Sequence, residues 1–444
     1  MNLEDAVDYL YNKANSAGVD QFDILAGFSE STGVEIFQSK IQNTEISSVN
    51  GIGIRLFVEG RPGISFTEKF STPALDQTLK DALSNSKITN RLDLDLPEAT
   101  VLPSLDLKSF EESIQDVHFQ EMVNLGMKLE DIALHSDERI ENVPYLGVGK
   151  SESSYVLRNS KGVSYSRRSN SISAYLGVTA ALEDQKKMGV YANSYRSFQD
   201  FNPQFMASKA VSRGIELLGA KPISGGNYPI LFSNRISTSL MGMFLSPYFA
   251  ESVQKERSRL KGRLGEKIAS EKLNLICDPH IPGMPGSKYL DSEGVPTSKT
   301  EIIKDGVLKT FLYNLESAKK DGVKPTGHGS RGHTGKAGTT TSNLFIPRGT
   351  KSTEELLKTF PKMLYITKLE GGSGCSSISG DISIGVQGFY YENGERVHPV
   401  DKITLSGNYF DMIQMILDLS NEYSDSYSSV KMPDILVESM AIAG

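Results

Sequence analysis

The sequence of 444 residues contains no tryptophan and only two cysteines, Cys277 and Cys375. Two cysteines this far apart exclude a CxxC motif and a framework of several disulfide bonds, so free thiols in a reducing compartment are expected. No apolar run approaches the roughly 20 residues that a membrane-spanning helix needs. The N-terminal segment MNLEDAVDYLYNKANSAG carries acidic side chains where a signal peptide carries basic ones. These absences together predict a cytoplasmic protein that does not enter a membrane.

Motifs for metal-dependent and nucleophilic catalysis are also missing. None of the six histidines is followed by glutamate, so the helical zinc motifs HExxH and HExxxH are absent. The sequence has no GxSxG nucleophile elbow and no GxxxxGK[ST] phosphate loop. We therefore assign no catalytic residue and no metal ligand from motifs.

The segment GHGSRGH contains the nearest candidate for a metal site, since it holds His328 and His333. Five residues of helix correspond to a rotation that would point the two side chains about 140° apart. The glycines predict a mobile loop with exposed histidines instead of a helix. A metal held by loop residues stays open as an alternative.

Basic residues number 47 and acidic residues 54, which gives a formal net charge of -7. Proteins that bind nucleic acids generally present a basic surface, so a nucleic-acid partner is not expected. Hydrophobic residues make up 38% and charged residues 23% of the chain, as is typical of globular proteins. A chain of this length is expected to form two or three domains with an ample core.

Apolar residues at helical spacing alternate with stretches of β-forming residues. Helices are predicted over 3–14, 72–86, 119–136, 205–220, 352–360 and 408–420. An acidic, proline-containing connector is predicted at 93–109, and a glycine-containing linker at 221–227. These segments predict an N-terminal α+β region over 1–220, with a further boundary near 93–109, and a C-terminal domain over 228–444.

Three dipeptides have the composition of tight hairpin turns: Glu59-Gly60, Asp305-Gly306 and Asn393-Gly394. Strands therefore gather in antiparallel hairpins and do not alternate with helices one for one. This pattern predicts an α+β fold with hairpin-rich antiparallel sheets flanked by helices.

The stretch DSEGVPT, residues 291–297, places two carboxylates next to a glycine and a proline. As a functional site, Asp291 and Glu293 would act as a general base or bind a peptide amine. As a structural element, Pro296 favours an extended residue before it, Gly294 permits a positive φ, and Asp291 binds backbone N–H groups at the bend. The hairpin that follows immediately favours the structural interpretation.

The C-terminal half resembles a known family. The string GSKYLDSEGVPTSKTEIIKDGVLKTFLYNLESAKKDGVKPTGHGSR is similar to the C-terminal domain on the PmbA/TldE side of the TldD/PmbA family. Later blocks of the family resemble SGDISIGVQGFYYENGERVHPV and LSGNYFDMI, and GIGIRLFVEGRPGISFT resembles an N-terminal hairpin of the family. The resemblance extends over essentially the whole chain, because these motifs occur in the family's order and spacing.

The resemblance implies a cytoplasmic assembly of two related subunits. In this family, TldD binds zinc through a helical HExxxH motif and a downstream cysteine, and it acts as a metallopeptidase on unfolded or short peptides. The PmbA/TldE subunit lacks these ligands and completes the complex. An older description, as a modulator of DNA gyrase, belongs to the same family.

This chain resembles the zinc-less subunit, because the helix that would bear the zinc ligands here reads RISTSLMGMFLS. The resemblance therefore implies no cofactor in this chain, zinc in a TldD-like paralogue as partner, and a homodimer when the chain is alone. Candidate residues facing a peptide-binding cavity are Asp291, Glu293, His328, Arg55 and Arg61, although surface positions are the default expectation for the two arginines. The alternatives are a binding protein without hydrolytic activity, of the gyrase-modulator type, and an autonomous peptidase that uses Asp291, Glu293 and His328.

Overall fold

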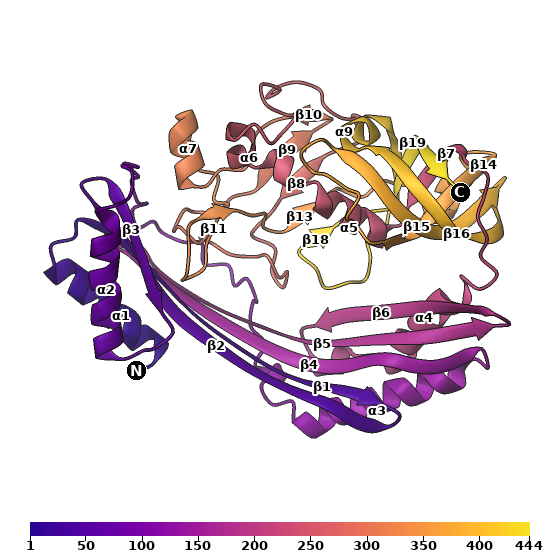
Figure 1. Ribbon diagram of the computed structural model, residues 1–444, viewed down its shortest axis with the longest axis horizontal. Coiled ribbons are helices and arrows are strands. Elements are labelled where there is room, and N and C mark those ends of the chain that lie inside the picture. The colour runs from indigo at the N-terminus through magenta and orange to yellow at the C-terminus, as the bar shows by residue number, and fades with distance from the viewer.

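The computed structural model describes all 444 residues, and its N-terminal part is built on one curved antiparallel sheet (Figure 1). The strand order is β3-β2-β1-β4-β5-β6. The strands are β1 (Gln21–Phe37), β2 (Lys40–Val58), β3 (Arg61–Thr67), β4 (Ile140–Asn159), β5 (Ser164–Leu182) and β6 (Gln185–Tyr195). Strands β1–β3 precede the connector at 93–109 and strands β4–β6 follow it, so the residues on both sides of the connector form one sheet.

Four helices cover one face of this sheet in two pairs. Helices α1 (Leu3–Ser16) and α2 (Thr72–Ser86) pack on one end, and α3 (Phe119–Ser136) and α4 (Pro203–Ile215) pack on the other. Figure 1 shows these helices on the outer side of the curve and the second part of the molecule on the inner side. Each pair has its own hydrophobic core.

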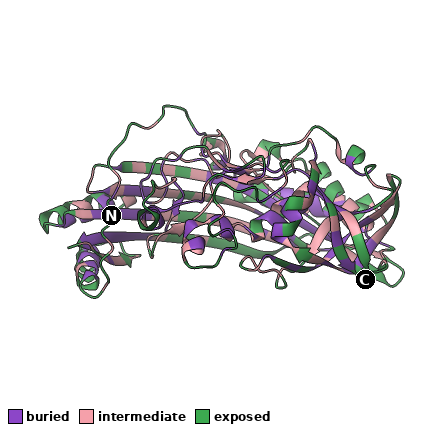
Figure 2. Ribbon diagram, turned by 90° about the horizontal axis from the view of Figure 1, so that it is seen from above, coloured by how far each residue is buried: buried purple, intermediate pink, exposed green.

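Side-chain alternation along β1 directs residues to the two faces of the sheet. Ile24 and Ala26 lie in the core beneath α1 and α2, whereas Leu25 packs with Leu290 of the second part. Residues two apart on a strand share a face, so Asp23 also faces the second part. Residues 22–26 are all buried, because both faces of the sheet are covered here. Figure 2 shows buried, intermediate and exposed stretches along the long strands.

The C-terminal part begins at β7 (Gly226–Phe232), which includes the last residues of the expected linker. Its larger sheet has the order β16-β15-β14-β7-β19-β17, and an additional pairing between β16 and β19 closes five of these strands into a barrel. The remaining strands of this sheet are β14 (Lys362–Glu370), β15 (Asp381–Glu392), β16 (Glu395–Asn408), β17 (Ile416–Leu419) and β19 (Ile435–Ala443).

A smaller five-stranded sheet packs beside the barrel, in the order β10-β9-β8-β13-β18. Its strands are β8 (Leu275–Cys277), β9 (Thr300–Lys304), β10 (Val307–Leu308), β13 (Leu344–Phe345) and β18 (Val430–Lys431), and β11 (Gly329–Ser330) pairs with β12 (Gly338–Thr339). The helices of this part are α5 (Asn234–Met243), α6 (Ala250–Gln254), α7 (Leu315–Asp321), α8 (Thr353–Leu356) and α9 (Tyr409–Met412). None of the helices in the molecule is long and apolar enough to span a membrane.

The structure confirms the α+β fold and the three predicted turns. Both residues of each turn have positive φ: 51° and 74° at Glu59-Gly60, 49° and 76° at Asp305-Gly306, and 52° and 82° at Asn393-Gly394. These values are those of type I′ turns, which match the twist of antiparallel strands.

Two helices expected near the C-terminus are much shorter than predicted. Helix α8 is a single turn, and the stretch 408–420 forms α9, a 3-10 turn (Ile413–Met415) and the strand β17. Ile416 and Leu419 of β17 pair with Val437 and Ile435 of β19. Pairing with a distant strand overrides the local helical pattern, because the strand pairing buries both apolar residues.

Candidate functional site

The DSEGVPT stretch forms a bend that is closed by a bridge between Leu290 and Pro296. Gly294 occupies the bend with φ of 84°. The Asp291 carboxylate accepts hydrogen bonds from the backbone N–H groups of Glu293 at 2.9 Å, Val295 at 3.0 Å and Gly329 at 2.7 Å. Asp291 thus holds the bend and ties β11 to it, as the structural interpretation of the sequence expects.

Glu293 connects this bend to the N-terminal sheet through Arg55. One guanidinium nitrogen of Arg55 lies 2.8 Å from Glu293 Oε1, and another lies 2.5 Å from Asp23 Oδ2. Arg331 binds the other carboxylate oxygen of Asp23 at 2.5 Å. Glu293 Oε2 accepts the N–H of Leu315 at 2.8 Å, at the start of α7. We call Asp23, Arg55, Glu293 and Arg331 the Arg55 ion cluster.

The fold brings the cluster together from both parts of the chain. Asp23 and Arg55 face each other in register on β1 and β2, while Glu293 and Arg331 come from the C-terminal part. All four residues are buried. Two arginines face two carboxylates, so the cluster compensates its own charge where the two parts meet.

The electrostatics of the cluster follow from this burial. Burial disfavours the charged form of Arg55, but Asp23 and Glu293 outweigh it and raise the pKa of Arg55. Burial, with the nearby charge of Glu293, raises the pKa of Asp291 to about 7, although the three N–H groups favour its ionised form.

His328 is buried beside the same bend, and so the expectation of an exposed histidine is wrong. Its Nδ1 lies 2.9 Å from Thr326 Oγ1, and its Nε2 has no hydrogen-bond partner. Burial, followed by the charge of Lys288, lowers the pKa of His328 to about 4. The ring is therefore neutral at neutral pH, and no carboxylate is bonded to it.

The loop that contains the second histidine packs tightly on β2. A Cβ atom at Gly53 would lie 1.8 Å from the backbone oxygen of His333, and one at Gly51 would lie 2.1 Å from its ring. The absence of side chains at these two positions lets the loop of the C-terminal part rest directly on the N-terminal sheet. The predicted mobile loop is therefore a packed contact between the two parts.

Replacing Gly53 with alanine is expected to destabilise the protein by about 1–3 kcal/mol, because the new methyl group meets a backbone atom that cannot rotate away. Urea unfolding followed by circular dichroism measures the loss. Gly27→Ala is the matched control, since Gly27 lies in the neighbouring strand and its nearest atom would be 3.9 Å from the new Cβ. Equal unfolding midpoints for the two variants would contradict the predicted contact.

Of the five candidates from the sequence, the structure brings Asp291, Glu293, His328 and Arg55 to one junction and leaves Arg61 outside. Arg61 is exposed and donates to the carbonyl of Thr89 at 3.0 Å. The default expectation that Arg55 lies at the surface was wrong. Sequence reasoning missed Asp23 and Arg331, although an acid within the apolar run FDILAGF is a signal of a buried pair. The junction pairs its charges internally and holds the two parts together.

Helix α5 occupies the place where the resemblance puts zinc ligands. It has serine, leucine, methionine and glycine in place of histidine and glutamate, and Ser237 donates to the carbonyl of Phe232. Asp434 accepts bonds from the N–H of Asn234 and the hydroxyl of Thr353, both at 2.5 Å. No group of three histidine, cysteine, aspartate or glutamate side chains is placed to bind one metal ion. The residues around α5 therefore do not fit a zinc ion.

A cleft of about 610 Å³ opens beside α5, between α4 and the C-terminal part. We call it the α4–α5 cleft. Its walls come from β6, α4, the start of α5, β14, β15 and the segment after β17. It is lined by Met188, Val190, Phe205, Lys209, Ser212, Arg213, Glu216, Leu217, Ser233, Asn234, Arg235, Tyr365, Thr367, Lys368, Phe389, Glu422, Tyr423, Ser424 and Asp425. Apolar rings and charged groups of both signs share this space.

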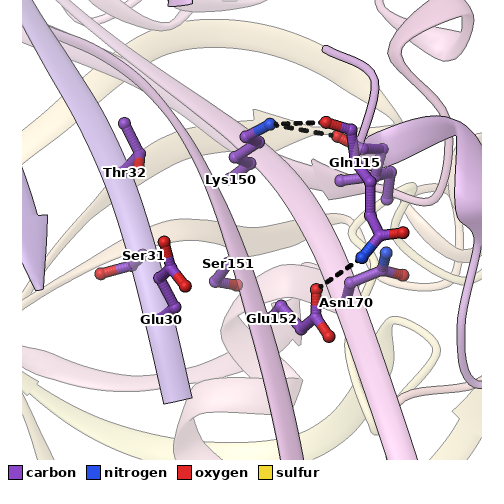
Figure 3. A pocket seen from close by; sticks show the side chains of 9 residues that line it. Glu30, Ser31, Thr32, Gln115, Lys150, Ser151, Glu152 and Asn170 are labelled. Atoms are coloured by element: carbon purple, nitrogen blue, oxygen red, sulfur yellow. Dashed lines mark hydrogen bonds between the residues drawn. The ribbon is translucent and has the colours of Figure 1, made fainter. Parts of the chain in front are cut away.

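A smaller pocket of about 230 Å³ lies on the sheet itself (Figure 3). Lys150 donates to the backbone carbonyls of Gln115 and Val117 at 3.0 and 2.7 Å. The side-chain amide of Gln115 donates to Glu152 at 3.2 Å. These bonds attach the segment after the 3-10 turn Glu112–Ile114 to the sheet, so the residues that line the pocket have a structural role.

Comparisons with known proteins agree on one family. Its domain models match residues 22–86 as PmbA/TldA metallopeptidase domain 1, 112–218 as the central domain and 225–444 as the C-terminal domain. The metalloprotease PmbA of Escherichia coli O157:H7 is 29% identical over 424 residues, which cover 94% of this chain and 91% of the relative.

Solved structures share the fold over the full length of the chain. A Thermotoga maritima protein that carries the name of a DNA gyrase modulator is 29% identical, with a TM-score of 0.91 and full coverage of both chains. TldE from Thermococcus kodakarensis is 21% identical, with a TM-score of 0.87 over 99% of this chain and 100% of its own. The second likeness concerns the fold alone.

Proposed function

Because the chain belongs to the PmbA/TldD family, whose domains are described as those of the PmbA/TldA metallopeptidases, we propose that it is the zinc-less, PmbA/TldE-like component of a cytoplasmic metallopeptidase. In this proposal a TldD-like paralogue supplies the zinc, and the complex cleaves unfolded or short peptides. This chain completes the cavity that holds the peptide.

The composition of α5 carries this proposal. A catalytic zinc site needs three protein ligands and an open position for water. The helix offers no imidazole or carboxylate, and Asp434 nearby is engaged by Asn234 and Thr353. Without such ligands the chain has no means to lower the pKa of a zinc-bound water by itself.

The α4–α5 cleft supports a role in holding a peptide. Its volume lies within the range of about 300–1,000 Å³ that is common for ligand sites. The strand β6 at its wall is the last strand of the N-terminal sheet, and it pairs only with β5. An extended peptide can add to such an edge through backbone hydrogen bonds, nearly independently of its sequence.

The burial of Asp291, Glu293 and His328 argues against an autonomous peptidase that would use these three residues. The carboxylate oxygens of Asp291 and Glu293 already accept hydrogen bonds from backbone N–H groups and from Arg55. A general base needs to reach a substrate proton within hydrogen-bond distance. These groups are buried where the two parts of the chain meet, so they have a structural role in this proposal.

Peptide cleavage by the chain alone and with its zinc-bearing paralogue tests the proposal. We expect neither stoichiometric zinc nor cleavage in the pure chain, and strong cleavage by the pair that a chelator abolishes. The paralogue without this chain is the control, and its activity should be lower than that of the pair. Stoichiometric zinc together with cleavage in the pure chain would overturn the proposal. An inactive pair would favour a binding protein without hydrolysis.

We also propose that the chain forms a homodimer when its partner is absent. The strand β2 pairs with β3 only from Ile52 onward, so the outer edge of residues 40–50 is open. Ile46 on this stretch is 73% exposed. Open edges with apolar side chains favour pairing with another chain. Light scattering that finds a monomer at high concentration would refute the dimer.

A further inference from the structure

The α4–α5 cleft contains two arginines that no carboxylate neutralises directly. Arg213, near the end of α4, donates to the carbonyl of Val190 at 2.7 Å, and Arg235, in the first turn of α5, donates to the carbonyl of Thr367 at 3.0 Å. Neither forms an ion pair within 4.0 Å. A guanidinium has five N–H donors, so each arginine keeps donors for a ligand.

Both arginines are held in place before any ligand arrives. The guanidinium of Arg213 also lies over the ring of Tyr191, 5.1 Å from its centroid. Burial lowers the pKa of Arg235 to about 10; the charge of Arg213 adds to this effect, whereas Tyr365 and Asp425 oppose it. Both arginines line the same cleft. Both remain charged at neutral pH. An anion that enters the cleft is attracted by both fixed guanidinium groups.

The charge of the cleft lining limits the anion that fits. The lining has four positive side chains, because Lys209 and Lys368 accompany the two arginines. It has three negative ones, Glu216, Glu422 and Asp425, so its net charge is +1. Asp425 is already engaged by the hydroxyl of Tyr191 at 2.7 Å. A single carboxylate balances this charge, whereas a phosphate dianion would leave an excess negative charge in the cleft. Arginine also binds carboxylates through two parallel hydrogen bonds.

The lining of the cleft also contains apolar side chains. Seven of its lining residues are hydrophobic, among them Phe205, Phe389 and Tyr365. They offer surface for one or more apolar side chains next to the arginines. Thus the cleft combines two arginines with free donors, apolar side chains and the edge of β6.

We propose that the α4–α5 cleft binds the C-terminal carboxylate of a peptide through Arg213 and Arg235, with the preceding apolar side chains against the apolar residues of its lining. This inference rests on the proposed function in one respect, namely that the ligand is a peptide. It adds that the chain selects a free C-terminus, and so sets which end of a peptide this subunit holds.

Fluorescence anisotropy of the full chain with a labelled hexapeptide of alanine, leucine and phenylalanine tests the proposal. We expect the peptide with a free carboxylate to bind at least about tenfold more tightly than its C-terminal amide, a difference of about 1.4 kcal/mol. Arg235→Met should reduce the affinity for the free acid to that for the amide. Arg91→Met is the matched control, because Arg91 is exposed and paired with Asp93 outside the cleft.

The comparison of acid and amide on the wild-type chain does not depend on a variant that folds. Arg235→Lys keeps the positive charge and should retain part of the preference for the free acid. Equal affinities for acid and amide, or no binding of either peptide, would overturn the proposal. A preference that survives both Arg235→Met and Arg213→Met would also overturn it.

Assays with the zinc-bearing paralogue separate this inference from the proposed function. If the chain activates the paralogue but does not distinguish acid from amide, only the carboxylate site is wrong. If the chain prefers the free acid but never affects the paralogue, the site stands and the proposed function fails.

Discussion

Replacing Arg55 with methionine is expected to lower the free energy of unfolding by about 3–5 kcal/mol, the usual cost of removing one partner from a buried ion pair. The substitution leaves Asp23 and Glu293 buried with one cation, Arg331, and Arg331 forms an ion pair with Asp23 but not with Glu293. Because Asp23 lies on β1 and Glu293 lies in the C-terminal part, the loss concerns the contact between the two parts. Urea unfolding followed by circular dichroism measures the loss in a chain that lacks tryptophan.

Arg61→Met provides the matched control for this experiment. Arg61 lies on the other side of the Glu59-Gly60 turn from Arg55, and it is exposed and forms no ion pair. Its replacement should therefore change stability by no more than about 0.5 kcal/mol. Limited proteolysis of Arg55→Met should release fragments cut near the connector at 93–109 or the 221–227 segment earlier than in the wild type. Similar stability of the two variants would mean that the Arg55 ion cluster does not join the two parts.

The contribution of the Asp291 carboxyl group to the stability of the chain is expected to fall as pH rises from about 4 to 7. Burial raises the pKa of Asp291 from 3.8 to about 7. The folded chain therefore binds this proton more tightly than the unfolded chain does, so its contribution to stability is complete at low pH and is lost as pH rises through 7. The shift corresponds to about 4 kcal/mol across this range. Asp434, whose pKa burial raises to about 6, adds to the same trend. His328, whose pKa burial lowers to about 4, acts in the opposite direction, because its neutral ring favours the folded chain as pH rises from about 4 to 6.5.

Unfolding midpoints at several pH values in this window measure the slope. Asp291→Asn is expected to be less stable overall, because an amide nitrogen cannot accept the N–H bonds that a carboxylate accepts. Its slope between pH 4 and 7 should nevertheless be flatter than that of the wild type. Asp305→Asn, at an exposed turn position, should keep the wild-type slope. Equal slopes for the wild type and Asp291→Asn over this window would contradict the assignment.

Much of the local structure could be predicted because its causes lie within a few neighbouring residues. The turns at Glu59-Gly60, Asp305-Gly306 and Asn393-Gly394 depend on residues that tolerate positive φ. The helices at 72–86 and 119–136 begin and end where the apolar spacing does. The bend at DSEGVPT needed only Gly294, Pro296 and an adjacent acid to be recognised as structural.

The helix expected over 408–420 shows where local reasoning fails. Its pattern suits a helix, but the C-terminal strand β19 recruits Ile416 and Leu419 into a sheet. His328 shows the same limit, since a glycine-rich segment that reads as mobile is buried between the bend and β12. In both cases the deciding partner is distant in sequence, and local propensity is weaker than the burial that the partner provides.

By itself, the sequence determined the α+β class, the hairpins, the family resemblance and the absence of a zinc motif on the helix that reads RISTSLMGMFLS. Each of these depends on residue types, their order and their spacing. Only the tertiary structure decided that Arg55 is buried between Asp23 and Glu293, that Arg61 is not, and that Arg213 and Arg235 face one cleft. Charges placed hundreds of residues apart meet only when two sheets pack, and the energy of such a pair depends on distance and burial, which the sequence does not contain.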